Sequence, residues 1–103
     1  MSAEESFHRS YERFRCRAEA DAGVFQGEIR SVSMNGAFLS ARRPVALGKE
    51  LRLSFRLPDG TPVSAVAEVR RVTNDANAVG LGIRFVRINH EAHQAILRFT
   101  RQG

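Results

Sequence analysis

The sequence has 103 residues, of which 43% are apolar and 26% are charged, values that are typical of one soluble globular domain with a modest core. No apolar run approaches the roughly 18 residues that a membrane span needs. Residues 1–5 are polar and acidic, where a signal peptide would be basic and then apolar. We therefore expect a cytoplasmic protein without membrane insertion.

Arginine supplies nearly all of the positive charge. The formal net charge is +5, and Lys49 is the one lysine among 16 basic residues. Arginine offers a planar, permanently charged fork that suits phosphates and guanine edges. An anionic partner therefore fits the composition, although a GC-rich genome, which encodes Arg in preference to Lys, would give the same bias.

Few residues offer catalytic or metal-binding chemistry. Cys16 is the only cysteine, so it cannot form an internal disulfide, and its place in an apolar row predicts a buried thiol. His8, His90 and His93 lie in an expected tail and an expected helix. The sequence shows no Ser/His/Asp set, paired carboxylates or metal-ligand spacing. We expect neither an enzyme nor a protein with a metal or other cofactor.

Alternation of apolar and polar residues predicts strands through most of the chain. Gly27 is a candidate bulge or bend within one of them. Turn signals separate the strands at residues 21–23, 58–60 and 74–77. The predicted strands, which follow a polar tail over residues 1–8, cover residues 14–20, 24–32, 37–40, 51–57, 63–72 and 79–86.

The C-terminal residues change to helical spacing. Asn89 is a good N-cap, Glu91 suits the first turn, and Ala92, Ile96 and Phe99 repeat along one face. About six short antiparallel strands followed by one helix predict a mainly β protein, a small barrel or highly curved sheet with a helix attached.

A polar turn between the second and third predicted strands is the strongest candidate for a binding site. Its sequence is Ser31-Val32-Ser33-Met34-Asn35-Gly36. Gly and Asn tolerate the positive φ that turns several amides one way, so such a turn can present hydroxyls and free backbone N–H groups to an anion. Ser31, Ser33, Asn35 and Gly36 are therefore candidate ligand-binding residues.

Three arginines spaced four residues apart precede this turn: Arg9, Arg13 and Arg17. A segment that carried them over the turn would add cations for phosphates or guanine edges. Arg9 and Arg13 stand before the first strand and form the favoured pair. Arg17 lies within that strand and points outward, so it is a supporting or rival candidate.

The order of these parts resembles the PilZ domain family. Arg9-Ser10-Tyr11-Glu12-Arg13 resembles its R-x-x-x-R motif, and residues 31–36 resemble its [D/N]-x-S-x-x-G motif. Gly82-Ile83-Arg84-Phe85 and the C-terminal helix also agree with the family. The resemblance implies a single PilZ domain over residues 9–103, with a six-stranded antiparallel barrel and a C-terminal α-helix, after a flexible tail over residues 1–8.

PilZ domains are bacterial receptors for cyclic di-GMP, and the resemblance implies the same function here. Cyclic di-GMP would bind to Arg9, Arg13 and the turn, with Arg17 as a further candidate. Binding would change the conformation and regulate an unidentified protein partner in motility, biofilm formation or pilus function. A chain of one domain must act on another protein or through its own association state, as a monomer or a homodimer.

Ser31 stands where the family has Asp or Asn. Loss of a charge-assisted hydrogen bond costs about 1–3 kcal/mol, or about one to two orders of magnitude in Kd. Binding is then weak, is maintained by other contacts, or is lost. The alternative is a degenerate PilZ protein that binds no nucleotide and acts as a protein-interaction adaptor. Nonspecific nucleic-acid binding fits the charge, but exposed aromatic residues are too sparse for a stacking platform, so we do not expect it.

Overall fold

Seven strands and one C-terminal helix make up the part of the chain that the structure describes, residues 9–21, 23–74 and 78–102 of a computed structural model. The predicted tail over residues 1–8 and most of the predicted 74–77 loop lie outside these residues. The elements are β1 (Arg9–Ser10), β2 (Phe14–Ala20), β3 (Gly23–Ser33), β4 (Gly36–Ala41), β5 (Glu50–Arg56), β6 (Pro62–Asn74), β7 (Val79–Ile88) and α2 (His90–Gln102).

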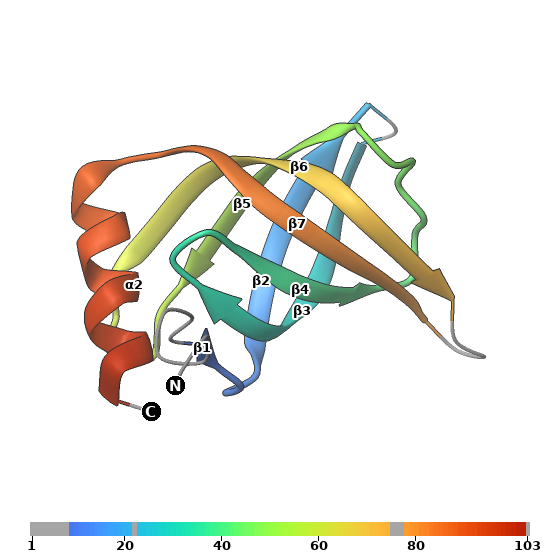
Figure 1. The fold of residues 1–103 in the computed structure, drawn as a ribbon. Helices are drawn as coiled ribbons and strands as arrows, with labels where there is room; N and C mark the ends of the chain where they lie inside the picture. The colour runs from blue at the N-terminus through green and yellow to red at the C-terminus, as the bar shows by residue number, and fades with distance from the viewer. Residues whose placement is uncertain (1–8, 22, 75–77, 103) are drawn as a thin grey trace.

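Six of the strands close into an antiparallel barrel (Figure 1). Their order around the barrel is β3, β2, β5, β6, β7 and β4, and β4 pairs again with β3. The predicted six-stranded antiparallel barrel with a C-terminal helix is therefore confirmed. The additional strand β1 pairs with the end of β3. The sequence does not predict β1, because two residues are too few to show an alternating pattern.

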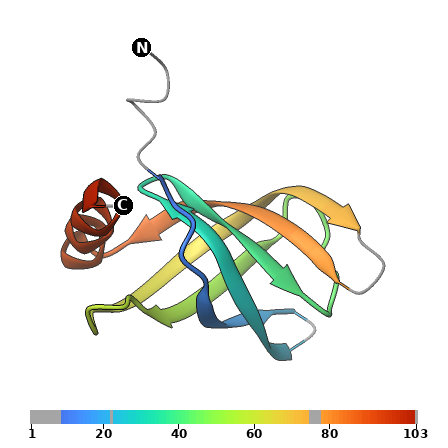
Figure 2. The same cartoon turned by 90° about the horizontal axis from the view of Figure 1, so that it is seen from below.

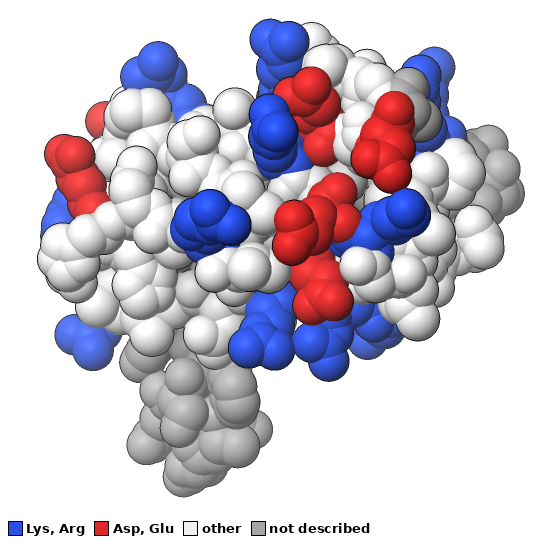
Figure 3. Space-filling view, turned by 90° about the horizontal axis from the view of Figure 1, so that it is seen from above, with Lys and Arg blue, Asp and Glu red and all other residues white. Residues whose placement is uncertain are grey.

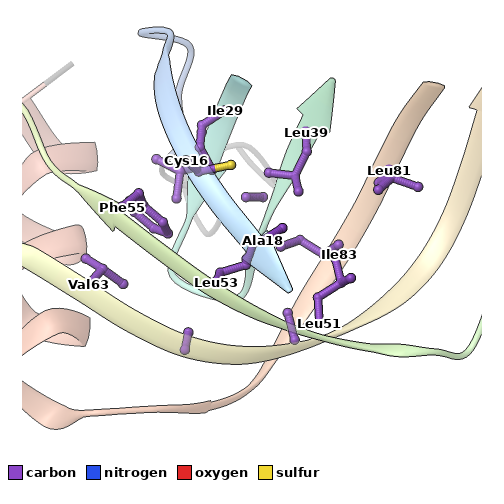
Figure 4. Close-up of a cluster of buried hydrophobic side chains, with 14 of the residues drawn as sticks. Cys16, Ala18, Ile29, Leu39, Leu51, Leu53, Phe55, Val63, Leu81 and Ile83 are labelled. Carbon is purple, nitrogen blue, oxygen red and sulfur yellow. The ribbon is translucent and has the colours of Figure 1, made fainter. Parts of the chain in front are cut away.

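Apolar side chains from the barrel strands fill the interior (Figure 4). Strict alternation in β5 turns Leu51, Leu53 and Phe55 inward, while the residues between them are exposed. Leu39 of β4 is fully buried in the same core. Cys16 is also buried, as predicted, and burial raises the pKa of its thiol to about 11 because the thiolate would lose its hydration.

Shifts of register interrupt the ladders of the barrel. One falls at Arg30 of β3, opposite β4, and another falls at Arg70 of β6, opposite β7. The predicted bulge at Gly27 is wrong, because Gly27 pairs regularly with the strands on both sides. A Cβ atom at Gly27 would lie 3.0 Å from the carbonyl oxygen of Ser40, so close packing explains this glycine.

The helix α2 packs beside the end of the barrel where β1 lies (Figures 1 and 2). The backbone N–H of Ala92 donates to Asn89 Oδ1 at 2.7 Å, which confirms the predicted N-cap. Ile96 is fully buried, and the ring of Phe99 lies edge-on to Phe14, with centroids 6.2 Å apart. Within the described residues, no helix has the length and apolar character that crossing a membrane requires.

Candidate functional site

Residues 9–13, which we call the arm, lie against the strand that leads into the Ser31–Gly36 turn. Arg9 pairs with Ser33 and Ser10 pairs with Val32, so β1 forms a short antiparallel ladder with the end of β3. Figure 2 shows the blue segment that contains β1 running alongside β3. The arginine segment and the serine turn, which the sequence singles out separately, are therefore neighbours in space.

The middle of the arm bulges away from β3. Between the pairs Ser10–Val32 and Phe14–Ile29, three residues of the arm face two residues of β3. The extra residue lets the arm project, and Tyr11, with 74% of its surface exposed, and Arg13 are both exposed. The arm therefore presents a cation and an aromatic ring to solvent next to the turn.

The Ser31–Gly36 turn is packed more tightly than the sequence suggests. Ser31 and Ser33 are only 6% and 5% exposed. Ser33 Oγ donates to the carbonyl oxygen of Gly36 and accepts the N–H of Asn35, both at 3.4 Å. The N–H of Asn35 is therefore engaged within the turn and is not free for an anion, contrary to the expectation from the sequence.

Gly36 has a different role from the predicted one. Its φ is not positive, because the described glycines with a positive φ are Gly23, Gly48 and Gly60. Instead, a Cβ atom at Gly36 would overlap the carbonyl oxygen of Ile83. Only glycine lets the start of β4 approach β7 this closely.

The backbone connects the turn directly to β7. The N–H of Phe85 donates to the carbonyl oxygen of Asn35 at 2.8 Å. Gly36 itself pairs with Arg84 of the same strand. The turn is therefore held between the arm on one side and β7 on the other, which makes it a rigid base for a binding site.

Arg17 lies far from the turn, in contrast to Arg9 and Arg13. It is exposed on β2 and pairs with Gln26. Gln26 precedes Ser33 by seven residues along β3, which corresponds to about 23 Å at about 3.3 Å per residue. The structure thus places the backbone of Arg9 beside the turn, puts Arg13 at the other end of the arm next to Phe14, and leaves Arg17 apart.

A groove of about 490 Å³ beside the turn contains residues that the sequence analysis missed. It is open to solvent and reaches Ser31 from the outer face of the barrel. The guanidinium of Arg71 lies 5.8 Å from the centre of the Phe38 ring, within cation–π range. The lining residues are Tyr11, Ser31, Ala37, Phe38, Arg70, Arg71, Gly82 and Ile83.

Local backbone geometry creates this groove. The register shift at Arg70 turns both Arg70 and Arg71 to the outer face of β6. A Cβ atom at Gly80 would overlap the ring of Phe38, so glycine lets this ring lie over β7. One feature of the sequence could have indicated this groove. In the alternating pattern of residues 63–72, Arg71 falls at a position where the pattern expects an apolar residue, and a bulge explains the exception.

Arg30 is a second residue that the sequence analysis missed. It occupies the register shift next to Ser31 and is half-buried. Its Nε is buried and has no hydrogen-bond partner among the described residues. A buried donor without an acceptor is unfavourable by about 1–3 kcal/mol, so an acceptor from a ligand would be favourable at this position.

Positive charge is not spread evenly over the rest of the surface. Figure 3 shows acidic and basic side chains side by side on the face seen from above. One groove over β2, β5 and β6 is lined by both acidic and basic residues, namely Glu19, Asp21, Glu50, Arg52 and Arg87. A site that tracks a nucleic-acid backbone would need a continuous basic surface, which this face does not provide.

The fold and the arm define a small β-barrel module with an arginine-bearing N-terminal segment. The chain matches the model of the PilZ domain family over residues 5–102, and it therefore belongs to this family. No curated protein matches the chain.

Three solved structures illustrate the similarity of this chain to proteins with the same fold. The Bacillus subtilis inhibitor of motility (MotI/DgrA) has a TM-score of 0.83 at 19% identity, over 93% of this chain and 49% of that chain. YcgR from Escherichia coli in complex with c-di-GMP has a TM-score of 0.78 at 10% identity, over 93% and 44%. The PilZ domain of YcgR with c-di-GMP has a TM-score of 0.73 at 10% identity, over 93% and 88%. The chain thus spans about half the length of the first two proteins.

Proposed function

We propose that this chain is a cyclic di-GMP receptor that changes conformation on binding and regulates a partner protein in motility, biofilm formation or pilus function. The observation that carries the proposal is the pairing of Arg9 with Ser33, which lays the arm along the turn. Structures of the same fold contain c-di-GMP, and one is an inhibitor of motility. As such a receptor, the domain over residues 9–103 would act in the cytoplasm.

The ligand's chemistry matches the groups on this face. Cyclic di-GMP has two phosphates and two guanines, so its site needs forked cations for phosphate oxygens and for guanine O6 and N7. The proposed ligand contacts are Arg9 and Arg13 of the arm and Ser31, Ser33, Asn35 and Gly36 of the turn. Arg17 lies outside it because of its distance along β3.

The groove supplies contacts that offset the absence of Asp or Asn at position 31. Phe38 and Arg71, which lie 5.8 Å apart, each offer a planar group on which a guanine can stack. Arg70 is exposed beside them, and its ion pair with Glu68, at 3.6 Å, lies at the surface. Such pairs contribute about 0–1 kcal/mol, so Arg70 can exchange Glu68 for a phosphate at little loss.

Packed aromatic rings connect the arm to the helix α2. Phe14 follows the arm at once, and its ring packs 5.6 Å from Phe55 and 6.2 Å from Phe99 of α2. α2 also contacts β1 itself. A ligand that reorders the arm would therefore shift the packing of α2. We propose that a protein partner binds to the exposed surface of α2.

The competing function is a protein-interaction adaptor that binds no nucleotide. Two observations favour it: Ser31 has a short, uncharged side chain, and the N–H of Asn35 is already bonded within the turn. Under this alternative the arm would stay fixed on β3, and a partner would recognise the barrel without a small ligand.

Isothermal titration of the purified chain with cyclic di-GMP distinguishes the two functions. We expect saturable binding, with GTP inactive, and loss of binding in an Arg9→Ala/Arg13→Ala variant. The matched control is Arg52→Ala/Arg56→Ala on β5, which removes two arginines at the same spacing on a different strand. If no heat of binding is detected up to about millimolar ligand, the receptor proposal is overturned in favour of the adaptor. A Kd of about 1 mM corresponds to only about 4 kcal/mol of binding free energy. The stoichiometry of the titration, together with light scattering, would separate monomer from homodimer.

A further inference from the structure

A second groove lies at the opposite end of β3 from the arm. β4 pairs with β3 only from Val32 to Gly27 and ends at Ala41. β3 continues back to Gly23, where it pairs with β2 alone. The β3 edge over residues 24–26 that faces the β4–β5 loop thus pairs with no strand in the described part of the chain. Figure 1 shows β4 diverging from this end of β3.

The space between this edge and the β4–β5 loop is a groove of about 830 Å³. Phe25 is half-buried at its floor, and the guanidinium of Arg43 lies 5.9 Å from the centre of the Phe25 ring. No residue of this groove belongs to the groove beside Ser31. The lining includes Arg15, Phe25, Gln26, Glu28, Arg42, Arg43 and Pro44.

The groove combines positive charge with apolar surface. Arg15, Arg42 and Arg43 face it with exposed side chains, and Glu28 is the single acidic residue of the lining. Phe25 and Pro44 supply apolar contacts between these charges. A ligand with alternating carboxylates and apolar side chains would satisfy both kinds of group.

We infer that this groove binds an extended acidic peptide of a partner protein, which pairs with residues 24–26 of β3 as an additional strand. An open strand edge offers backbone N–H and C=O groups that a peptide can pair with, and pockets for alternate side chains then give specificity. Carboxylates of the peptide would meet Arg15 and Arg42, while its intervening side chains would cover Phe25 and Pro44.

A nucleic acid fits this groove less well. Its sugar–phosphate backbone offers no pattern of N–H and C=O groups that could pair with a strand edge. Phe25 is the one aromatic residue of the lining, so the groove has no row of rings on which successive bases could stack.

Backbone amide NMR on the labelled full chain tests the inference. The probe is a short, end-blocked peptide in which Glu and Val alternate, and the comparison probes are a Lys/Val peptide, an oligothymidylate and inorganic phosphate. We expect the Glu/Val peptide to shift the amides of residues 24–28 and 40–44 and to slow hydrogen exchange at the β3 edge. The Lys/Val peptide should leave these amides unchanged.

Charge reversal in the groove provides the decisive comparison. Arg15→Glu/Arg42→Glu should weaken peptide binding at least tenfold, while the equally charged control Arg56→Glu/Arg98→Glu, outside the groove, should not. Both variants should bind cyclic di-GMP as the unmodified chain does, so the result is independent of the proposed receptor function.

Three results would overturn the inference. The first is that the Glu/Val peptide, up to about millimolar concentration, shifts no amide at the β3 edge. The second is that the Arg15→Glu/Arg42→Glu variant binds the peptide as tightly as the unmodified chain does. The third is that oligothymidylate or phosphate displaces the peptide from the same residues. Thermal unfolding of each variant shows whether it remains folded, and the conservative variant Arg15→Gln/Arg42→Gln replaces a charge-reversed variant that does not fold.

Discussion

The two ends of β3 (Gly23–Ser33) differ in what surrounds them. Near Ser33, the strand is paired on one side with β1 and on the other with β4, and Val32 is fully buried. Near Gly23, it is paired with β2 alone, and Val24 is 44% exposed. β3 thus has one end paired on both sides, beside the proposed cyclic di-GMP site, and one end with an open edge, where we propose peptide binding, because β4 spans only part of its length.

The largest effect that we expect concerns the rigid end. Gly36→Ala would place a Cβ atom against the Ile83 carbonyl oxygen, so β4 must move from β7 and the turn must distort. We expect the free energy of unfolding to fall by about 3 kcal/mol or more, as measured by urea denaturation.

Gly60→Ala is the matched control for this substitution. Gly60 has a φ of 95° but nothing within 4 Å of its Cβ position, so we expect a loss of about 1–2 kcal/mol from backbone strain alone. Equal losses at the two glycines would show that close approach to β7 does not define the rigid end.

The next effect tests whether the open end admits water to the core. Cys16 pairs with Gly27, the last residue of β3 that β4 covers, and the pKa of its thiol is raised from 9.0 to about 11 by burial. Above pH 9 the unfolded thiol ionises while the folded one stays neutral, so this group removes stability as the pH rises from 9 to 11. The full loss is about 3 kcal/mol.

Comparison with Cys16→Ala isolates this contribution. We expect the unmodified chain to lose more stability than the variant between pH 9 and 11, in urea denaturation at each pH. Parallel pH profiles for the two chains would indicate an ordinary thiol pKa, and therefore a hydrated core beneath the open end.

The same truncation at the two ends of β3 gives a direct comparison. Val32→Ala should lower the free energy of unfolding by about 2 kcal/mol, because it removes methyl groups from a fully buried site. Val24→Ala should change it by about 0.5 kcal/mol or less, because Val24 is partly exposed. Similar losses would mean that the edge at Val24 is covered in solution, for example by self-association.

The smallest effect concerns the groove beside Ser31, which we propose is part of the cyclic di-GMP site. Arg71→Ala should weaken cyclic di-GMP binding by about tenfold, equivalent to about 1.4 kcal/mol, because the cation over Phe38 is lost. Isothermal titration measures this change, and Arg87→Ala on β7 is the control. An unchanged Kd would exclude Arg71 from the site and leave binding to the arm and the turn.

The sequence by itself determined the barrel strands and the helix, and it singled out the turn and the arm as a candidate site. Alternation in residues 51–57 predicts β5, and Asn89 predicts the start of α2, because both signals are local and follow from the periods of strand and helix. The proximity of Arg9 to the serine turn is consistent with the family resemblance, although the two-residue strand β1 gives no pattern of its own.

Only the tertiary structure decided which groups share a surface. The closure of β4 on β7 explains Gly36, and the register shift at Arg70 brings Arg71 over Phe38, which is far from it in the sequence. The register of the β2–β3 hairpin separates Arg17 from the turn, and the end of β4 at Ala41 leaves the β3 edge open. Register and closure depend on contacts between distant strands, so no local pattern of residues can predict them.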